Sequence, residues 1–148
     1  MNILPASIRD IEEVISWIAT EEESRIWAGP AITFPISKAR LLDEISFCPE
    51  NSFSLRSDTG LLAFGQIMQK NDGRSHLARI ISNPTYRGQG FGRKICNYLV
   101  DHASEHGSGE VSLNVYRKNT HALRLYESLG FREQTEKSDD TSIFMLKT

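Results

Sequence analysis

A short glycine-rich segment narrows the possible folds more than any other part of the sequence, and it reads Arg87-Gly88-Gln89-Gly90-Phe91-Gly92. Before it, we expect a strand from His76 to Ser82. After it, Ile95 and Ala103 belong to one apolar helical face, and Gly107 is placed to end that helix. The sequence therefore predicts a strand, a glycine loop and a helix of about four turns in succession.

A glycine loop that opens a helix suits an anionic ligand, above all a phosphate. Backbone N–H groups converge at a helix N-terminus, and the helix macrodipole adds to their partial positive charge. Glycines let this backbone approach a ligand closely because they have no Cβ atom. Arg87 and Arg93 flank the segment and can pair with phosphate oxygens. We therefore expect a phosphate-bearing ligand at this loop.

Two well-known phosphate loops do not match the segment. A dinucleotide-binding loop has a third glycine where this chain has Arg93. A nucleoside triphosphate loop ends in Gly-Lys followed by Ser or Thr, whereas Gly92 is followed by Arg93-Lys94-Ile95. A third interpretation assigns no ligand to the glycines, which then only permit a tight turn between the strand and the helix.

The first half of the chain predicts helices followed by strands. Ser7 is placed to cap a helix whose apolar residues share one face, and Ser37 to cap a second, shorter helix. Residues 21–35 have no clean period and contain a glycine and two prolines, so we expect a loop there. Alternation that begins at Phe53 predicts a meander of three strands ending at Ser82.

The second half predicts a strand over residues 111–115, a helix ended by Gly130, and two last strands near residues 131–136 and 142–147. Strands and helices in this order favour an α/β or α+β domain with helices covering a mixed sheet. A chain of 148 residues is long enough for one substantial core, so we expect residues 1–148 to form a single domain.

Composition narrows the possible locations and partners. A formal net charge of −2 gives no general attraction to nucleic acid or to anionic membranes. No apolar run reaches the roughly 20 residues of a membrane-spanning helix, and the start of the chain does not resemble a secretory signal, so we expect a cytoplasmic protein. Cys48 and Cys96 lie far apart without a metal-ligand pattern around them, which predicts reduced thiols and no metal site.

Two motifs in the second half carry a resemblance to a known family. The run Ile80-Ile81-Ser82-Asn83-Pro84-Thr85-Tyr86-Arg87-Gly88-Gln89-Gly90-Phe91-Gly92 resembles the acetyl-coenzyme A motif of the GNAT superfamily of N-acetyltransferases. Further along, the superfamily's second motif is similar to Leu113-Asn114-Val115, Asn119, Ala122, Leu125-Tyr126-Glu127 and Leu129-Gly130-Phe131. The resemblance implies a GNAT-like mixed, mostly antiparallel sheet of about six or seven strands with about four helices, in the order β-α-α-β-β-β-α-β-α-β-β.

The resemblance also implies how acetyl-coenzyme A, the acyl donor, is bound. The backbone of Ile80, Ile81 and Ser82 would bind the pantetheine arm, and an N–H there would polarise the thioester carbonyl. The amides from Arg87 to Arg93, which include those of Gly88, Gln89, Gly90, Phe91 and Gly92, would hold the pyrophosphate. Asn119 would bond the pantetheine arm.

The resemblance places the phenol of Tyr126 beside the sulfur, where it would supply a proton to the leaving thiolate. The same tyrosine also belongs to the apolar stripe of its helix, which is the plainer interpretation. The general base is less defined. Asn114 stands where some members have a glutamate, and an amide cannot take a proton. His76 is a candidate base; the alternatives are an ordinary surface histidine and a chain of water molecules.

The expected function is transfer of an acetyl group from the thioester to a primary amine, of a small molecule or of a peptide N-terminus or lysine. Trp27 and Phe34 would form an apolar wall for this acceptor, although both residues equally suit a core. The main alternative is a protein that binds acyl-coenzyme A without catalysis, as a sensor or interaction module. A more remote alternative function is that of a dinucleotide-dependent oxidoreductase. The resemblance also allows a homodimer.

Overall fold

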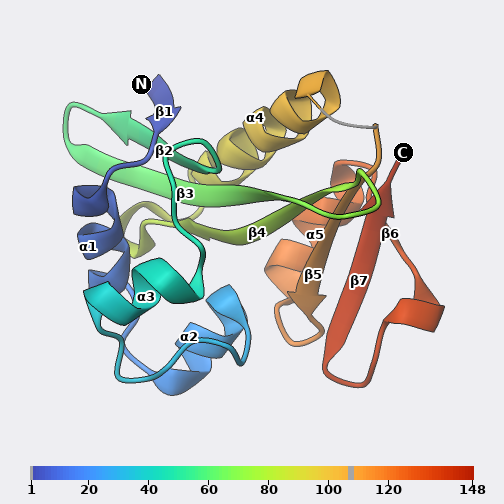
Figure 1. Ribbon diagram of the computed structural model, residues 1–148, viewed down its shortest axis with the longest axis horizontal. Helices are drawn as coiled ribbons and strands as arrows, with labels where there is room; N and C mark the ends of the chain where they lie inside the picture. The colour runs from blue at the N-terminus through green and yellow to red at the C-terminus, as the bar shows by residue number, and fades with distance from the viewer. Residues whose placement is uncertain (1, 107–108) are drawn as a thin grey trace. The chain divides into compact units, whose positions relative to one another are not determined.

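The computed structural model describes residues 2–106 and 109–148 (Figure 1). By its internal contacts the chain divides into two compact units, Met1–Gln66 with Arg79–Cys96 and Ile67–Ala78 with Asn97–Thr148. The predicted end of the long helix, at Gly107, lies outside the described residues.

The elements alternate between strands and helices along the chain. They are β1 (Asn2–Pro5), α1 (Ile8–Ser16), α2 (Glu21–Ala28), α3 (Lys38–Glu44), β2 (Ser52–Ser57), β3 (Gly60–Gln69), β4 (Ser75–Ser82), the 3-10 turn η1 (Pro84–Tyr86), α4 (Phe91–His106), β5 (Val111–Tyr116), α5 (Thr120–Ser128), β6 (Arg132–Glu133), the 3-10 turn η2 (Thr135–Lys137) and β7 (Ser142–Lys147).

The strands form a seven-stranded sheet in the order β1-β2-β3-β4-β5-β7-β6. The β1–β2, β2–β3, β5–β7 and β6–β7 pairs are antiparallel. The β4–β5 pair is parallel, with Ser75 opposite Val111 and Leu77 opposite Leu113. The predicted mixed and mostly antiparallel sheet with helices is confirmed.

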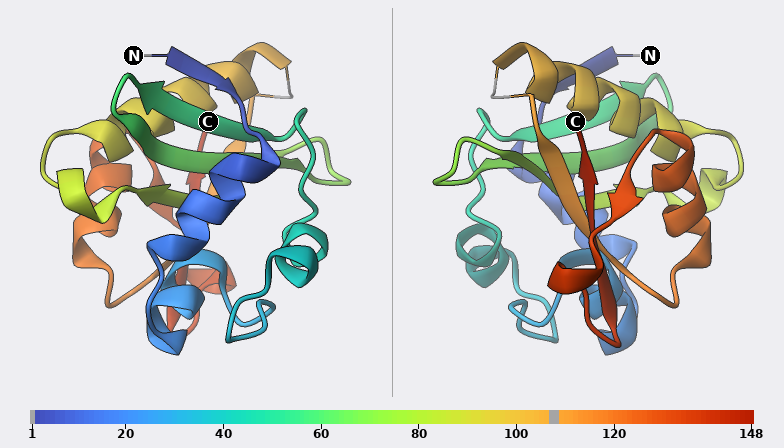
Figure 2. Two further views of the ribbon diagram at one scale, coloured as in Figure 1. Left: turned by 90° about the vertical axis from the view of Figure 1, so that its left-hand side faces the viewer. Right: turned by 90° about the vertical axis from the view of Figure 1, so that its right-hand side faces the viewer.

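In the first unit, three helices pack on one side of the strands. Figures 1 and 2 both show α1 and α3 on the same side of β2 and β3. The core between them contains Ile11 and Val14 of α1, Leu41 of α3 and Phe64 of β3, and none of the four is measurably exposed. Apolar residues three apart on α1 therefore meet the sheet, as the helical period predicts.

Side-chain caps explain where these helices begin. The Ser7 hydroxyl accepts a hydrogen bond from the Asp10 N–H at 3.2 Å, and the Asp10 carboxylate accepts one from the Ser7 N–H at 2.9 Å. The Ser37 hydroxyl accepts from the Arg40 N–H at 3.3 Å. Both predicted helix starts are confirmed.

The loop expected over residues 21–35 is wrong for its first part, because Glu21–Ala28 is helical. The helix begins with a capping box: Glu23 N–H donates to the Thr20 hydroxyl at 3.1 Å, and the Glu23 carboxylate accepts from Thr20 N–H at 3.1 Å. Gly29, with φ of 78°, ends the helix. The described residues thus contain one helix more than the predicted order.

In the second unit, β5 and β7 lie side by side, as Figures 1 and 2 show. Leu113 and Met145 are opposite each other in this pair and are both buried. Asn114, which follows Leu113, is exposed because successive side chains of a strand alternate between faces. Gly130, with φ of 99°, follows α5, as the sequence predicts.

Candidate active site

The glycine loop has a backbone that requires glycine at two positions. Gly88 and Gly90 have φ angles of 84° and 86°, in the left-handed region that L side chains rarely adopt. A Cβ atom added at either residue would meet nothing within 4 Å. The requirement is therefore conformational, and the space beside both glycines is open. Residues 87–90 are exposed, and α4 begins immediately after them at Phe91.

The loop presents backbone amides at the first turn of α4. The first hydrogen bond of the helix joins Lys94 N–H to Gly90 O at 3.0 Å. In the part of the chain that the structure describes, the amides of residues 88–92 donate no hydrogen bond of ordinary geometry to the protein. Unused donors and the positive end of the helix dipole are together suited to an anion. Arg87 and Arg93, also exposed, flank it.

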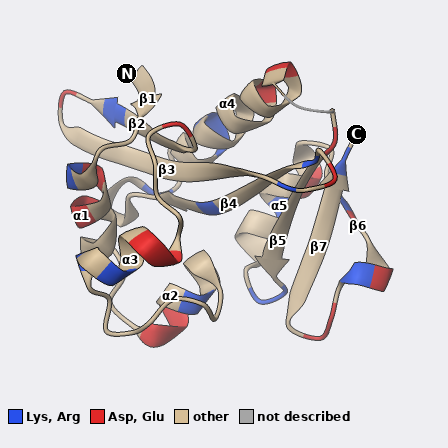
Figure 3. Cartoon of the chain, viewed as in Figure 1, with Lys and Arg blue, Asp and Glu red and all other residues tan. Residues whose placement is uncertain are grey.

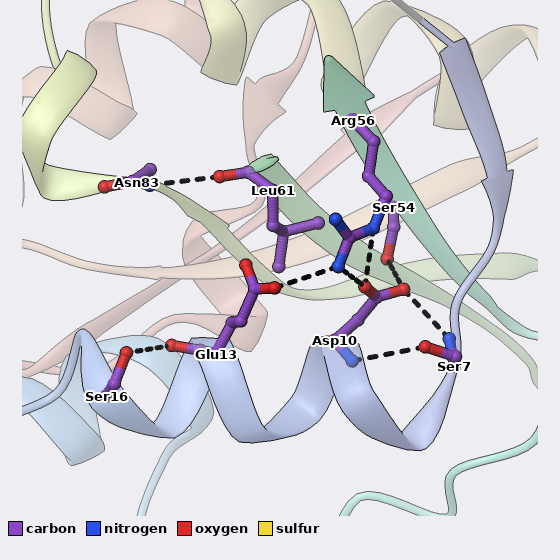
Figure 4. A network of polar contacts seen from close by, with 8 residues as sticks. All are labelled: Ser7, Asp10, Glu13, Ser16, Ser54, Arg56, Leu61 and Asn83. Atoms are coloured by element: carbon purple, nitrogen blue, oxygen red, sulfur yellow. Dashed lines mark hydrogen bonds and ion pairs between the residues drawn. The ribbon is translucent and has the colours of Figure 1, made fainter. Parts of the chain in front are cut away.

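Both ends of the loop are anchored within the first unit. Before the loop, Asn83 N–H donates to Leu62 O at 2.8 Å, and the Asn83 side-chain amide donates to Leu61 O at 3.0 Å (Figure 4). The Asn83 side-chain oxygen also accepts from Thr85 N–H at 3.0 Å. Beyond these contacts, the rings of Tyr86 and Phe91 meet edge to face with centroids 6.4 Å apart. These contacts hold the glycine loop on both sides through groups of the protein itself.

The strand residues that the sequence assigns to the pantetheine arm directly precede this anchor. Ile80, Ile81 and Ser82 form the last part of β4 and are each partly exposed. Ile81 packs against the core of the first unit. Both the strand end and the glycine loop belong to that unit.

Two further predicted residues lie on α5 in the second unit. Asn119 caps this helix, since its side-chain oxygen accepts a hydrogen bond from Ala122 N–H at 3.4 Å. Tyr126 is 8% exposed, and its ring meets the Phe131 ring edge to face, with centroids 6.2 Å apart. Tyr126 thus packs in a core, as its place on the apolar stripe predicts. Its role as a proton donor stays a prediction.

His76, the candidate base, is 9% exposed and is not the surface histidine of the alternative interpretation. Its Nδ1 atom lies 2.8 Å from the hydroxyl of Ser112 on β5. The same hydroxyl accepts a short hydrogen bond from Arg74, and the His76 ring stacks on Phe144 with centroids 6.4 Å apart. Through these contacts, His76 is part of the packing around the β4–β5 pair in the second unit.

The expected acceptor wall is divided between core and surface. Trp27 is 7% exposed and belongs to the core of the first unit, where its indole N–H donates to Arg79 O at 2.9 Å. Phe34 is partly exposed. The acidic run Glu21–Glu23 forms the exposed first turn of α2, shown in red in Figure 3. Part of this negative charge is paired within α2, because Glu21 forms an ion pair with Arg25 at 3.3 Å.

Arg79 of the first unit was not among the predicted site residues, yet its conformation is unusual. It has a φ of 54°, in the left-handed region, and its Nε atom is buried without a partner. Neither property has a signal in the sequence, because both follow from a local distortion of β4. Among the described residues, no group of three or more His, Cys, Asp or Glu side chains can hold a metal ion. No helix in the described ranges is both long and apolar enough to cross a bilayer.

A mixed sheet whose glycine loop opens a helix with unused amides is typical of proteins that bind a phosphate-bearing ligand. Comparison with known families narrows this class. The family model of the acetyltransferase (GNAT) family matches residues 11–131, and the chain belongs to that family. The predicted superfamily is confirmed.

The relatives found by sequence are N-acetyltransferases. The ribosomal protein bS18-alanine N-acetyltransferase of Escherichia coli K12 is 36% identical over 84 residues, which are 57% of this chain and 56% of that protein. The spermine/spermidine N(1)-acetyltransferase of Bacillus subtilis 168 is 31% identical over 77 residues, or 51% of each chain. This chain thus spans about half the length of the curated relatives it matches.

Solved structures share the fold over nearly the whole chain. The ribosomal-protein-S18-alanine N-acetyltransferase of E. coli superposes with a TM-score of 0.74 at 24% identity, covering 99% of this chain and 92% of that one. The PaiA N-acetyltransferase of Thermoplasma acidophilum, solved in complex with coenzyme A, gives a TM-score of 0.76 at 22% identity. This superposition covers 99% of this chain and 98% of that one. At these identities the likeness establishes the fold.

Proposed function

We propose that this protein binds acetyl-coenzyme A and transfers its acetyl group directly to a primary amine. The observation that carries the proposal is the loop before α4. Gly88 and Gly90 are held at positive φ there, and the amides of residues 88–92 are left without protein acceptors. Family membership supports the ligand, since the loop resembles the family's acetyl-coenzyme A motif and lies within the matched residues 11–131.

The residues present fit this ligand. The amides from Arg87 to Arg93 would bind the diphosphate, with the arginine side chains at both ends supplying positive charge. The backbone of Ile80, Ile81 and Ser82 would bind the pantetheine arm as an added strand, and Asn119 would bond the same arm. When bound, acetyl-coenzyme A supplies the activated thioester that the amine attacks.

Transfer requires a proton for the leaving thiolate, and we assign its donation to the Tyr126 phenol. It also requires removal of a proton from the acceptor amine. Of the two candidates for this step, the burial of His76 and its contact with Ser112 favour water over the imidazole. A base must reach the proton it takes within hydrogen-bond distance, directly or through one water molecule.

The acceptor is a primary amine of a small molecule, a peptide N-terminus or a lysine. The relatives' names include a ribosomal-protein alanine and polyamines as acceptors, so amine chemistry is common to them. Phe34 is the partly exposed member of the proposed acceptor wall. Cytoplasmic location, homodimer formation and independence from nucleic acid stay predictions from the sequence.

The test has two stages. Calorimetry with acetyl-coenzyme A measures binding, and a thiol-release assay with a panel of primary amines measures transfer. We expect binding to one site and release above the hydrolysis background for at least one amine. Binding without release for any amine supports the alternative of a non-catalytic acyl-coenzyme A sensor. Absence of binding contradicts the proposal.

A further inference from the structure

Three aromatic side chains form a row along the second half of α4, within the second unit. Tyr98, His102 and His106 are spaced four residues apart, so they share one face of the helix. The ring centroids of Tyr98 and His102 lie 5.9 Å apart. Those of His102 and His106 lie 4.3 Å apart, and these two rings stack at an angle of 23°. His106 is exposed and His102 is partly exposed, so solvent reaches both histidines.

A backbone contact determines the tautomer of His106. Its Nδ1 atom lies 2.9 Å from the carbonyl oxygen of His102. A carbonyl oxygen only accepts, so Nδ1 carries the hydrogen, and the neutral ring has its lone pair at Nε2. Histidines that ligate a metal ion usually donate their other ring N–H in this way, which fixes the orientation of the ring. His106 therefore has the hydrogen bonding that is typical of a metal ligand.

The two imidazoles are close enough to share one cation. A Zn–N bond is about 2.0–2.1 Å long, so two nitrogen ligands of one tetrahedral ion lie roughly 3.3 Å apart. Ring centroids 4.3 Å apart are compatible with that separation. Two histidines four residues apart on one helical face also bind the zinc ion of metalloproteases. The helix thus provides the spacing that a shared ion requires.

The charges around this pair favour a cation. Residues 97–106 contain two carboxylates, those of Asp101 and Glu105, and no lysine or arginine. Both carboxylates are exposed, on the same turns of the helix as the two histidines. The pair also lies in the last turns of α4, where the helix macrodipole is negative. A positive ion bound there is stabilised by the carboxylates and by the dipole.

We propose that His102 and His106 form a binding site for a divalent transition-metal ion that prefers imidazole ligands, such as Cu²⁺, Ni²⁺ or Zn²⁺. Nε2 of His106 and a ring nitrogen of His102 coordinate the ion, and water completes its coordination shell. The sequence prediction of no metal site weighed only the surroundings of Cys48 and Cys96. The new site is separate from the residues assigned to the coenzyme and to acetyl transfer.

Binding at this pair stabilises the folded protein. The two imidazoles are neighbours only while residues 102–106 are helical, because the helix alone brings residues four apart onto one face. An ion that binds the folded chain and not the unfolded chain raises the free energy of unfolding with its concentration. The site therefore has two independent readouts, the affinity for the ion and the stability of the protein.

Calorimetry with nickel chloride, on protein that carries no affinity tag, tests the site. We expect one Ni²⁺ per chain, tighter binding of Cu²⁺, and no binding of Mg²⁺, which prefers oxygen ligands. His106→Gln should weaken the binding of Ni²⁺ at least about tenfold. His121→Gln, which removes a single exposed histidine of α5, is the matched control and should leave the affinity unchanged.

A second variant keeps the number of histidines constant. His106→Gln combined with Ser104→His leaves two exposed histidines on α4, but two residues apart instead of four. Side chains at that spacing do not face each other. The double variant should therefore bind Ni²⁺ as weakly as His106→Gln. Affinity equal to that of the wild type would overturn the assignment to this pair.

Urea unfolding at increasing concentrations of nickel chloride provides the second readout. The midpoint of the wild type should rise with the concentration of Ni²⁺, whereas the midpoint of His106→Gln should stay constant. Equal shifts in both proteins, equal affinities for Ni²⁺, or no binding of Ni²⁺ and Cu²⁺ to the wild type would each overturn the proposal. None of these measurements uses acetyl-coenzyme A or an amine, so their outcome is separate from that of the proposed function.

Discussion

The guanidinium of Arg56 on β2 bonds to the carboxylate of Asp10 on α1, with Nε donating to Oδ1 at 2.8 Å (Figure 4). The other Asp10 oxygen accepts from the Ser54 hydroxyl at 2.8 Å and from the Ser7 N–H at 2.9 Å. Asp10 is 3% exposed, so its charge is almost fully removed from water. Arg56 also reaches Glu13 at 3.0 Å. This network joins the first helix to the sheet beneath it.

Asp10→Asn should lower the free energy of unfolding by about 1–3 kcal/mol. The substitution removes the charge that Arg56 pairs with, while Glu13 continues to offer part of the compensation. Glu12→Gln on the same helix is the matched control. Its pair with Lys38 is about half exposed, and such pairs contribute about 0–1 kcal/mol. Urea unfolding measures the free energy of unfolding of both variants. Equal losses in Asp10→Asn and Glu12→Gln would contradict the assigned role of Asp10.

The same carboxylate makes stability depend on pH in the acid range. Burial alone raises the pKa of Asp10, but hydrogen bonds from the Ser7 N–H, Arg56 and Ser54 outweigh it and hold the pKa below its ordinary 3.8. The unfolded chain therefore binds the proton more readily. The contribution of the ionised Asp10 carboxylate to stability is complete above pH 3.8. It is lost as the pH falls through the lower pKa that Asp10 has in the folded protein. Stability of the wild type and of Asp10→Asn, measured from pH 6 downward, should converge. A constant difference would contradict this.

Alanine at Gly88 or Gly90 should weaken binding of acetyl-coenzyme A about fivefold to thirtyfold. An L-residue at these φ angles costs about 1–2 kcal/mol, which distorts the loop and misaligns its amides. Gly60→Ala is the control, because Gly60 also has a positive φ and open space for a Cβ, but lies in the hairpin between β2 and β3. Calorimetry should show unchanged affinity for that variant. If all three alanine variants, at Gly88, Gly90 and Gly60, lost affinity for acetyl-coenzyme A, the cause would be a general effect on folding.

Tyr126→Phe should lower turnover by roughly tenfold to a thousandfold with little change in affinity for the coenzyme. The substitution keeps the ring that packs edge to face on Phe131 and removes only the hydroxyl. Tyr98→Phe on α4 is a suitable control for loss of a phenol. Single-turnover thiol release separates the chemical step from binding, and an unchanged rate would exclude Tyr126 as the proton donor.

His76→Gln should lower the free energy of unfolding by about 1–3 kcal/mol, because it disturbs the contact with the buried Ser112. It should leave the shape of the pH profile of kcat/KM unchanged, since water accepts the amine proton in our account. Disappearance of one limb of that profile in the variant would instead identify His76 as the general base.

The glycine loop could be predicted from sequence because the features that create it are local. Glycine spacing, the break at Pro84 and the helical period that follows all lie within one short stretch. The helix over Glu21–Ala28 was missed because Gly29 and the prolines after it obscure the period. The available signal was the capping box, Thr20 followed three residues later by Glu23.

Burial and pairing of single side chains were harder to predict. Strand propensity identified β4 but not the positive φ of Arg79, and composition cannot show that its Nε atom is buried without a hydrogen-bond partner. His76 looked like a surface residue because it lies near a strand start, whereas the parallel pairing with β5 buries it. These properties depend on long-range contacts, which a single sequence does not display.

Calorimetry with acetyl-coenzyme A beside S-acetylpantetheine tests the central claim most directly. Both molecules carry the thioester, but the second lacks the diphosphate that the amides of residues 88–92 are proposed to hold. We predict that acetyl-coenzyme A binds one site and that S-acetylpantetheine binds at least about a hundredfold more weakly. Equal affinity for the two, or no binding of acetyl-coenzyme A, would contradict the account.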